Sequence, residues 1–134
     1  MKLIPDTYSL KYIHSAGGNQ ELSTSVVKLE RNKELSIHSA YGDGPVDACY
    51  KAIDGITGLK GRLLEFNVTS VSRGKYALGE VCVHVEFNQQ TYTGKAAIVD
   101  IIYASARAYL NAVNKALYEL QRKKPKTPLA TKVT

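Results

Sequence analysis

The chain has no tryptophan, a single methionine, four prolines and two cysteines in 134 residues. Cys49 and Cys82 are too few for a disulfide framework and fall in helix and strand patterns, so we expect reduced core thiols and a cytoplasmic protein. No apolar run reaches bilayer-spanning length, and the first residues lack the pattern of a signal peptide, so we expect no membrane partner. The length and an apolar content of 44% fit one folded domain.

Motifs for catalysis and metal binding are also lacking. We find no P-loop, no G-x-S-x-G, no H-E-x-x-H and no paired-cysteine motif. His14, His38 and His84 fall in separate strand patterns, without a Cys, Asp or His at metal-ligand spacing. We therefore expect no catalytic residue, no metal and no cofactor in this chain.

The positive charge is concentrated near one end. The net charge is +6, and residues 122–126 read R-K-K-P-K. A nucleic-acid interface needs basic and aromatic side chains on a folded face, so we interpret residues 122–134 as a basic, disordered tail. The alternative is a small RNA-binding protein, with salt-dependent affinity and basic residues on an ordered face. Binding that is due merely to the tail would be abolished by trimming the chain after Gln121.

The hydrophobic pattern repeats once along the chain. Alternation predicts strands at 6–13, 22–30 and 35–41, with turns at 16–20 and 31–34, followed by a helix from Pro45 that ends at 55–61. The second half predicts strands at 62–72, 78–87 and 91–93, with turns at 73–75 and 88–90, then a loop at 94–96 and a long helix. We expect Tyr8, Leu10 and Tyr12 on one face of the first strand, and Leu64 with Phe66 on one face of the fourth.

This order indicates an α+β, two-layer fold of duplicated βββα units, each a three-stranded antiparallel sheet plus a helix. We place one domain at 1–121, with units at 6–58 and 62–121. Asp47 and Asp100 are expected at comparable places, each early in a helix. A sheet covered on one face leaves apolar surface, which predicts packing of the units on each other and a homodimer.

The turn before the first helix is the best candidate for a binding site. Gly42 and Gly44 flank Asp43, and Pro45 suits the first helical position. Backbone N–H groups at such a turn can hold the carboxylate of a small ligand; the alternative is an ordinary capped helix start. The simplest roles of the nearby acids are capping for Asp43, complementing the helix dipole for Asp47 and solvent exposure for Asp54.

These residues resemble a known family. YGDGPVDACYKAI at 41–53 and DIIYASARAYLNAVN at 100–114 are similar to two helix motifs of the C-terminal regulatory domain of 2-isopropylmalate synthase. LEF at 64–66 and ALGEV at 77–81 resemble its central strands, and the similarity covers residues 6–120. The resemblance implies a dimer of duplicated βββα units that binds leucine for feedback inhibition of leucine biosynthesis. Catalysis by that transferase belongs to a TIM-barrel domain outside these residues.

The resemblance also implies which residues bind the effector, between the units and near the dimer interface. They come from the glycine turn, the first strand of the second half with its hairpin partner, and the loop before the last helix: Gly42, Asp43, Gly44, Pro45, Val46, Asp47, Leu63, Phe66, Ser70, Ala77, Gly79, Gly94 and Ala96. Backbone N–H groups would bind the ligand carboxylate, and the branched side chain would lie on Leu63 and Phe66. We infer that Asp43 or Asp47 would bind the ammonium group.

The identity of the effector stays open at this point. The relatives citramalate synthase and homocitrate synthase imply isoleucine and lysine in place of leucine. Discrimination among branched side chains rests on a methyl group or two, worth about 1–3 kcal/mol.

Overall fold

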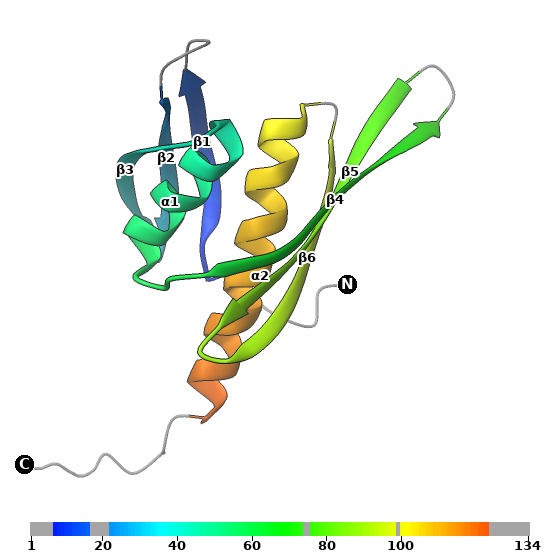
Figure 1. Ribbon diagram of the computed structural model, residues 1–134. Coiled ribbons are helices and arrows are strands. Elements are labelled where there is room, and N and C mark those ends of the chain that lie inside the picture. The colour runs from blue at the N-terminus through cyan, green and yellow to red at the C-terminus, as the bar shows by residue number, and fades with distance from the viewer. Residues whose placement is uncertain (1–6, 17–21, 74–75, 99, 124–134) are drawn as a thin grey trace, which may run out of the picture.

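Two βββα units follow one another along the chain, as the sequence predicts. The computed structural model describes residues 7–16, 22–73, 76–98 and 100–123 (Figure 1). The elements are β1 (Ser9–Ala16), β2 (Ser23–Arg31), β3 (Glu34–Gly42), α1 (Pro45–Thr57), β4 (Arg62–Arg73), β5 (Tyr76–Phe87), β6 (Gln90–Ile98) and α2 (Ile101–Lys123). None of the described helices is long and apolar enough to cross a membrane.

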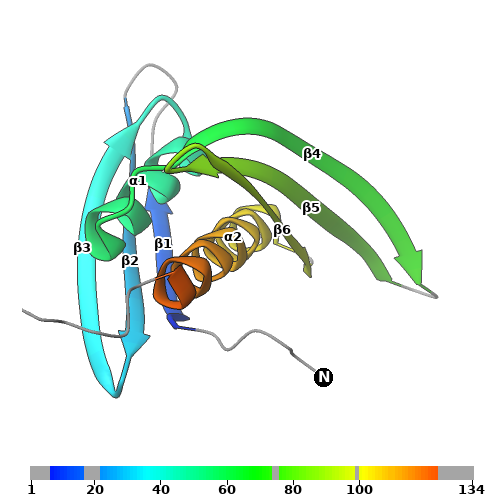
Figure 2. The same ribbon diagram turned by 90° about the horizontal axis from the view of Figure 1, so that it is seen from below.

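Each unit forms its own antiparallel sheet. Sheet A has the order β1-β2-β3 and sheet B the order β4-β5-β6. Asn32 and Lys33 connect β2 to β3, and Asn88 and Gln89 connect β5 to β6, all with φ between 52° and 67°. Positive φ at both turn residues makes each a type I′ hairpin, whose twist matches that of the strands. Helix α1 packs on sheet A and α2 on sheet B, and the two helices contact each other (Figure 2).

The duplication extends to irregularities of the strands. The pairing register shifts between Leu10 and Tyr12 in β1, and between Leu63 and Glu65 in β4. A β-bulge of this kind turns the following side chains to the opposite face. The two sheets therefore share a kink that the alternating pattern did not reveal.

These bulges correct two expectations. Tyr12 does not share a face with Leu10, because the bulge places it on the outer face of sheet A, 45% exposed. Leu63 rather than Leu64 pairs with Val85 on the inner face of sheet B, and Leu64 is 45% exposed. The first strand also lies later than expected, at Ser9–Ala16 instead of 6–13.

The last strand is longer than expected. The predicted loop at 94–96 is wrong, since these residues lie inside β6 and pair with β5. Gly94 lies directly against α2: a Cβ built there would overlap the Ala108 carbonyl oxygen and come within 2.9 Å of the Ala112 amide nitrogen. The glycine thus marks a close approach of helix to strand, a role that a glycine within a strand often has.

The ends of the helices follow local chemistry. Pro45 opens α1, and Gly58, with φ of 79°, ends it in the left-handed conformation that favours glycine. Helix α2 continues through Arg122 and Lys123, which the sequence assigned to the tail. The rest of the expected tail lies outside the described residues, as do residues 17–20 of the predicted turn at 16–20 and residues 74–75 of the predicted turn at 73–75.

One hydrophobic core joins the units. It contains Val27 and Leu29 of β2, Val81, Val83 and Val85 of β5, and the facing sides of both helices. Asn114 of α2 also holds the start of β1: its carboxamide accepts a hydrogen bond from the Tyr8 amide and donates one to the Tyr8 carbonyl, both 3.0 Å. The Asn114 side chain is buried, so this pair ties the first strand to the last helix.

Replacing Gly94→Ala should lower the free energy of unfolding by about 1–3 kcal/mol or more, because the added methyl group overpacks the β6–α2 contact. Urea unfolding monitored by circular dichroism measures the change. Gly44→Ala is the matched control: a Cβ there meets nothing within 4 Å, so its stability should stay within about 0.5 kcal/mol of the parent. Equal stability of the two variants would contradict the packing role of Gly94.

Candidate functional site

The start of α1 has unpaired backbone donors. Gly44 is the N-cap residue, with φ of −161°, and no side chain of the described residues caps the helix. The first amides of a helix have no intrahelical acceptor, so those of Val46 and Asp47 face outward. The space around Gly44 is open, since a Cβ built there meets no atom within 4 Å. The helix dipole adds partial positive charge at this point.

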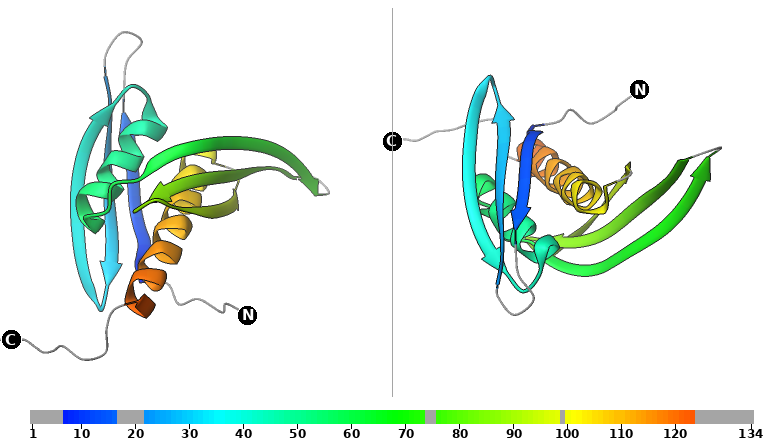
Figure 3. Two further views of the ribbon diagram at one scale, coloured as in Figure 1. Left: turned by 60° about the horizontal axis from the view of Figure 1, so that its bottom comes forward. Right: turned by 90° about the horizontal axis from the view of Figure 1, so that it is seen from above.

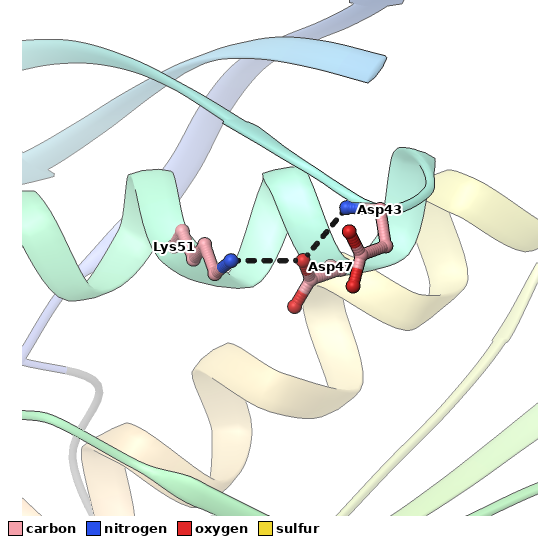
Figure 4. A network of polar contacts seen from close by, with 3 residues as sticks. All are labelled: Asp43, Asp47 and Lys51. Atoms are coloured by element: carbon pink, nitrogen blue, oxygen red, sulfur yellow. Dashed lines mark hydrogen bonds and ion pairs between the residues drawn. The ribbon is translucent and has the colours of Figure 1, made fainter. Parts of the chain in front are cut away.

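The turn before Gly44 is shaped by Asp47. Its Oδ2 atom accepts a hydrogen bond from the Asp43 amide at 3.0 Å and lies 3.1 Å from Lys51 Nζ (Figure 4). A Cβ at Gly42 would overlap this carboxylate and lie 2.8 Å from the Ala48 amide nitrogen. Gly42 is thus required by a close approach, whereas Gly44 is not.

The roles expected of two acids therefore change. Asp43 does not cap the helix; its amide is a donor to Asp47, and its side chain is exposed. Burial alone would raise the pKa of Asp47, but the Asp43 amide and Lys51 outweigh it, so the pKa lies below its usual value. The Asp47 carboxylate thus stays ionised, contacts its own turn and helix, and complements the dipole of α1.

The start of α2 is built differently. Asp100 Oδ1 accepts hydrogen bonds from the amides of Ile102 at 2.9 Å and Tyr103 at 3.2 Å. The Asp100 carbonyl accepts from the Ala104 amide, as the Gly44 carbonyl accepts from the Ala48 amide, so Asp100 corresponds to Gly44. The expected match of Asp47 with Asp100 is therefore wrong. In the second unit a side-chain carboxylate fills the place that the first unit leaves open.

Sheet B brings together most of the remaining expected residues. Cross-strand pairing forms rows across β4, β5 and β6: Phe66, Val83 and Gly94; Val68, Val81 and Ala96; Ser70, Gly79 and Ile98. Leu63 lies near the start of β4, opposite Val85, and is 42% exposed. Ala77 pairs with Ser72 toward the far end of the hairpin.

Within one chain, the structure does not bring the start of α1 together with the expected residues of sheet B. Helix α1 contacts sheet A and α2 but no described strand of sheet B. The α1 start and the rows of sheet B are thus separate surfaces, each attached to its own unit. Only α2 lies against both α1 and sheet B.

A polar contact between the helices was missed at the sequence level. The Tyr109 hydroxyl donates to Asp54 Oδ1 at 2.6 Å, and the Gly61 amide donates to Asp54 Oδ2 at 3.4 Å. The Tyr109 ring stacks on Tyr50, with centroids 4.1 Å apart. Asp54 is therefore half-buried instead of exposed as expected. Burial raises its pKa to about 6, although the Tyr109 hydroxyl, the Gly61 amide and Lys60 oppose the rise.

Two buried hydroxyl groups lie on the same pair of helices. Tyr50 of α1 and Ser105 of α2 are 6% and 0% exposed, and their hydroxyl groups have no hydrogen-bond partner among the described residues. Ser105 precedes Tyr109, the stacking partner of Tyr50, by about one helical turn. Buried hydroxyl groups usually have a partner, so a water molecule or a ligand atom is expected near them.

Other reactive side chains have structural surroundings. His84 Nδ1 lies 2.9 Å from the Thr93 hydroxyl, and its Nε2 lies 3.6 Å from Glu65. Burial raises the pKa of the Cys49 thiol to about 12, so it stays protonated. No cluster of three His, Cys, Asp or Glu side chains suited to a metal ion occurs in the part of the chain that the structure describes.

Comparison with known proteins decides the family. Residues 2–117 match the model of the LeuA allosteric (dimerisation) domain. The chain belongs to this family. It is 43% identical over 119 residues to the 2-isopropylmalate synthase of Heliobacterium modesticaldum, 42% over 123 residues to that of Pelotomaculum thermopropionicum, and 46% over 115 residues to that of Methylacidiphilum infernorum.

The matches cover most of this chain but only a small share of each relative. They include 89%, 91% and 85% of this chain but 23%, 24% and 23% of the respective relatives. The chain therefore spans about a quarter of the length of these synthases, the part that carries the allosteric domain. The resemblance inferred from the two helix motifs is confirmed.

The raised pKa of Asp54 predicts a pH-dependent stability. Its folded-state pKa of about 6 exceeds the usual 3.8, so stability from the protonated form is present below pH 4 and is lost as the pH rises through 6. The Asp54→Asn variant has no carboxyl group at this position, so its stability should not fall over this pH range for this reason. We expect the variant to gain about 1–2 kcal/mol relative to the parent between pH 4.5 and 7.5, a value reduced for the partial exposure of the carboxyl group.

Urea titrations of both proteins at several pH values measure this difference. Glu34→Gln, which removes an exposed carboxylate of β3, is the control and should follow the parent. A constant difference between Asp54→Asn and the parent across the range would show that Asp54 does not titrate in this window.

Proposed function

We propose that this chain is the feedback-regulatory domain of a 2-isopropylmalate synthase, that it binds leucine and that it holds two subunits together. The observation that carries the leucine site is the difference between the two helix starts. Asp100 caps α2 with its carboxylate, whereas Gly44 leaves the equivalent place on α1 open. The domain would comprise residues 1–121, with units at 6–58 and 62–121; α2 itself extends to Lys123.

In this proposal the ligand carboxylate takes the place at α1 that the Asp100 carboxylate takes at α2. Asp100 accepts from the amides two and three residues after it; the corresponding amides at α1 are those of Val46 and Asp47. Pro45 has no N–H group, so no donor is wasted at the first position. The dipole of α1 further favours a negative group there.

The ammonium group needs an acid that is not already engaged. Asp47 already accepts from its own turn and pairs with Lys51. Asp43 is exposed beside the open space and is the acid that we assign to the ammonium group. A charge pair at this place would distinguish an amino acid from a simple carboxylic acid.

The branched side chain of the ligand requires apolar surface, which the expected residues of sheet B would supply. Leu63 and Phe66 are partly exposed on β4, with Ser70, Gly79 and Ala96 in neighbouring rows. Since α1 contacts no described strand of sheet B, a ligand that touches both groups must lie between units or between two copies of the chain. Its binding would then favour one arrangement of the dimer over another.

Feedback control requires that the ligand bind one arrangement of the dimer more tightly than another. A ligand shifts an equilibrium only by its difference in affinity for the two states. Leucine bound between the two surfaces would stabilise one dimer arrangement, and the attached catalytic barrel would respond with lower activity. Condensation of an acyl-CoA with a 2-keto acid would take place in that barrel, in the cytoplasm.

Leucine should raise the melting temperature of the isolated chain by about 5–10 °C at about one hundred times its Kd, because it binds the folded form. A thermal-shift panel should include isoleucine, valine and lysine, to separate leucine from the effectors of citramalate and homocitrate synthases. A larger shift with isoleucine or lysine would reassign the effector. No shift with any of the four would contradict an effector site in this chain.

Replacing Gly44→Asp should give α1 the same cap as α2. The backbone at Gly44 is extended and the space is open, so the variant should fold, with roughly a few tenths of a kcal/mol added stability. Leucine affinity, measured by calorimetry, should fall about 10- to 100-fold, because the new carboxylate occupies the ligand's donors.

Gly44→Ala is the matched control, since its methyl group adds no acceptor and should leave affinity within about threefold of the parent, or roughly 0.6 kcal/mol. Unchanged leucine binding by Gly44→Asp would contradict the carboxylate position. Equal loss in both variants would indicate that the site requires glycine for space and not for its free amides.

A further inference from the structure

The two sheets have four edge strands, whose backbone groups face outward on one side. Sheet A is bounded by β1 and β3, and sheet B by β4 and β6. An unprotected edge strand is a template on which another extended segment can pair, and proteins block such edges with bulges, charged side chains or a covering element. Three of these four edges carry such a device, and β3 does not.

Helix α2 covers the edge of β6. Lys115 Nζ donates a hydrogen bond to the Thr93 carbonyl at 2.6 Å, and the Asn111 carboxamide donates one to the Lys95 carbonyl at 2.7 Å. Both carbonyls point away from β5, because residues of an antiparallel strand face their partner strand and the open edge in alternation. The acceptors that β6 would offer to another strand are therefore already used.

The edges of β1 and β4 are interrupted. Each strand contains one of the two β-bulges, and a bulge disrupts regular pairing along an edge. Lys11 adds a charge to β1, and Arg62 and Glu65 add charges to β4. Asn114 also binds the backbone of Tyr8, just before β1 begins. Neither strand offers a long, uncharged row of free groups.

The edge of β3 has none of these devices. Its nine residues pair with β2 without a register shift, and from Leu35 to Gly42 it contains no Asp, Glu, Lys, Arg or Pro. Among the described elements it contacts only β2 and α1, and Figures 2 and 3 show it as the outermost strand of sheet A. The edge is therefore open along the whole strand.

Alternate residues of β3 direct their backbone groups to this edge. The type I′ turn makes Arg31 and Glu34 a hydrogen-bonded pair, and bonded and non-bonded pairs alternate from there. The outward N–H and C=O groups have no hydrogen bond from the part of the chain that the structure describes. They belong to Leu35, Ile37, Ser39 and Tyr41.

The second unit has the side chains that the first unit lacks. At the offset between the two N-cap residues, the places of Asn111 and Lys115 are taken in the first unit by Gly55 and Leu59. Neither has a side chain that can donate a hydrogen bond, and α1 already ends at Thr57. The first unit thus has the same sheet as the second without the side chains that cover its last strand.

We propose that the free edge of β3 pairs with an extended segment from the rest of the synthase, which joins sheet A as a fourth strand. The inference rests on the proposed function, in which this chain is one domain of a longer enzyme, and adds a surface that connects the domain to the remainder. An extended backbone is the partner whose N–H and C=O groups match a strand edge residue by residue.

The side chains of β3 define the chemistry of this segment. Leu35, Ile37 and Tyr41 are 63%, 62% and 64% exposed on the outer face of sheet A, so apolar side chains at alternate positions of the segment would pack beside them. Thr91 and Thr93 of β6 stand at the places of Leu35 and Ile37. A charge on the paired segment would lose hydration without gaining a partner, so we expect a neutral segment rich in β-branched residues.

A segment of the same enzyme has an advantage over a free partner. The match covers about a quarter of each synthase, so most of such an enzyme is tethered to this domain. A tethered segment has an effective concentration in the millimolar range. It also loses less translational and rotational freedom on pairing than a free peptide does. A pairing of modest intrinsic affinity would therefore still be populated.

Hydrogen exchange, resolved at single amides by mass spectrometry, tests the pairing. The four outward amides of β3 should exchange at least about tenfold more slowly in the full-length synthase than in the isolated chain. The outward amides of Thr93 and Lys95 are the control, since the described contacts of α2 reach their carbonyl groups. Their rates should be the same in both proteins.

A proline at the edge removes the pairing. Ile37→Pro deletes one outward N–H group and leaves the bonds to β2 in place, a position at which an edge strand tolerates proline. In the synthase it should abolish the protection of the Leu35 and Ser39 amides. Thr93→Pro, the same change at the equivalent place in β6, should leave the protection of β3 unchanged.

Circular dichroism checks the fold of each variant. Should Ile37→Pro unfold, Ser39→Lys decides, because it introduces the residue that β6 has at the equivalent place, and a lysine on an edge opposes strand addition. It should lower the protection of the outward β3 amides in the synthase.

The outcomes separate this surface from the proposed function. Equal exchange of the β3 amides in both proteins would overturn the surface, as would protection that the folded variants leave unchanged. Protection already present in the isolated chain would overturn the assignment to the rest of the synthase, and its dependence on concentration would identify a second copy as the occupant. The leucine panel tests the proposed function by itself: a chain that binds leucine but shows no protected edge keeps that function and loses this surface.

Discussion

The contact of Tyr109 with α1 is the interaction on which the arrangement of the two units depends. Its ring stacks on Tyr50, and its hydroxyl donates to Asp54. The connection between the units must pass close to this ring, and a Cβ at Gly61 would overlap the Tyr109 hydroxyl. A buried tyrosine needs both apolar contacts and a hydrogen-bond acceptor, and here α1 supplies both. The relative position of sheets A and B follows from this packing of α1 on α2.

Duplication explains the architecture, and divergence between the copies identifies the candidate sites. Both units have the same strand order, turn type and bulge position. They differ at the helix start, where Gly44 replaces the capping Asp100, and on the outer face, where β3 is apolar and β6 polar. The second unit thus serves as an internal reference: each departure of the first unit from it exposes a group that a ligand or a partner could cover.

Much of the fold could be predicted because its signals are local. Pro45 and Gly58 bound α1, and the apolar spacing of α2 identifies a long helix. The bulges could not be predicted, since one extra residue leaves the composition of a strand unchanged while reversing its faces. Gly94 resembled a loop glycine because its partner, the Ala108 carbonyl, is distant in sequence. The glycine turn could be singled out as a candidate site, but the difference between Gly42 and Gly44 required their surroundings.

The sequence by itself determined the family, the duplicated βββα order and the turn at the start of α1, because these depend on motifs and on hydrophobic periodicity. Only the tertiary structure decided the roles of the acids. Asp43, Asp47 and Asp54 lie within one short segment, yet one is exposed, one pairs with its own helix and one is half-buried against Tyr109. The physical reason is that desolvation and hydrogen-bond partners come from residues far along the chain. For the same reason, the open cap at Gly44 became apparent only beside Asp100.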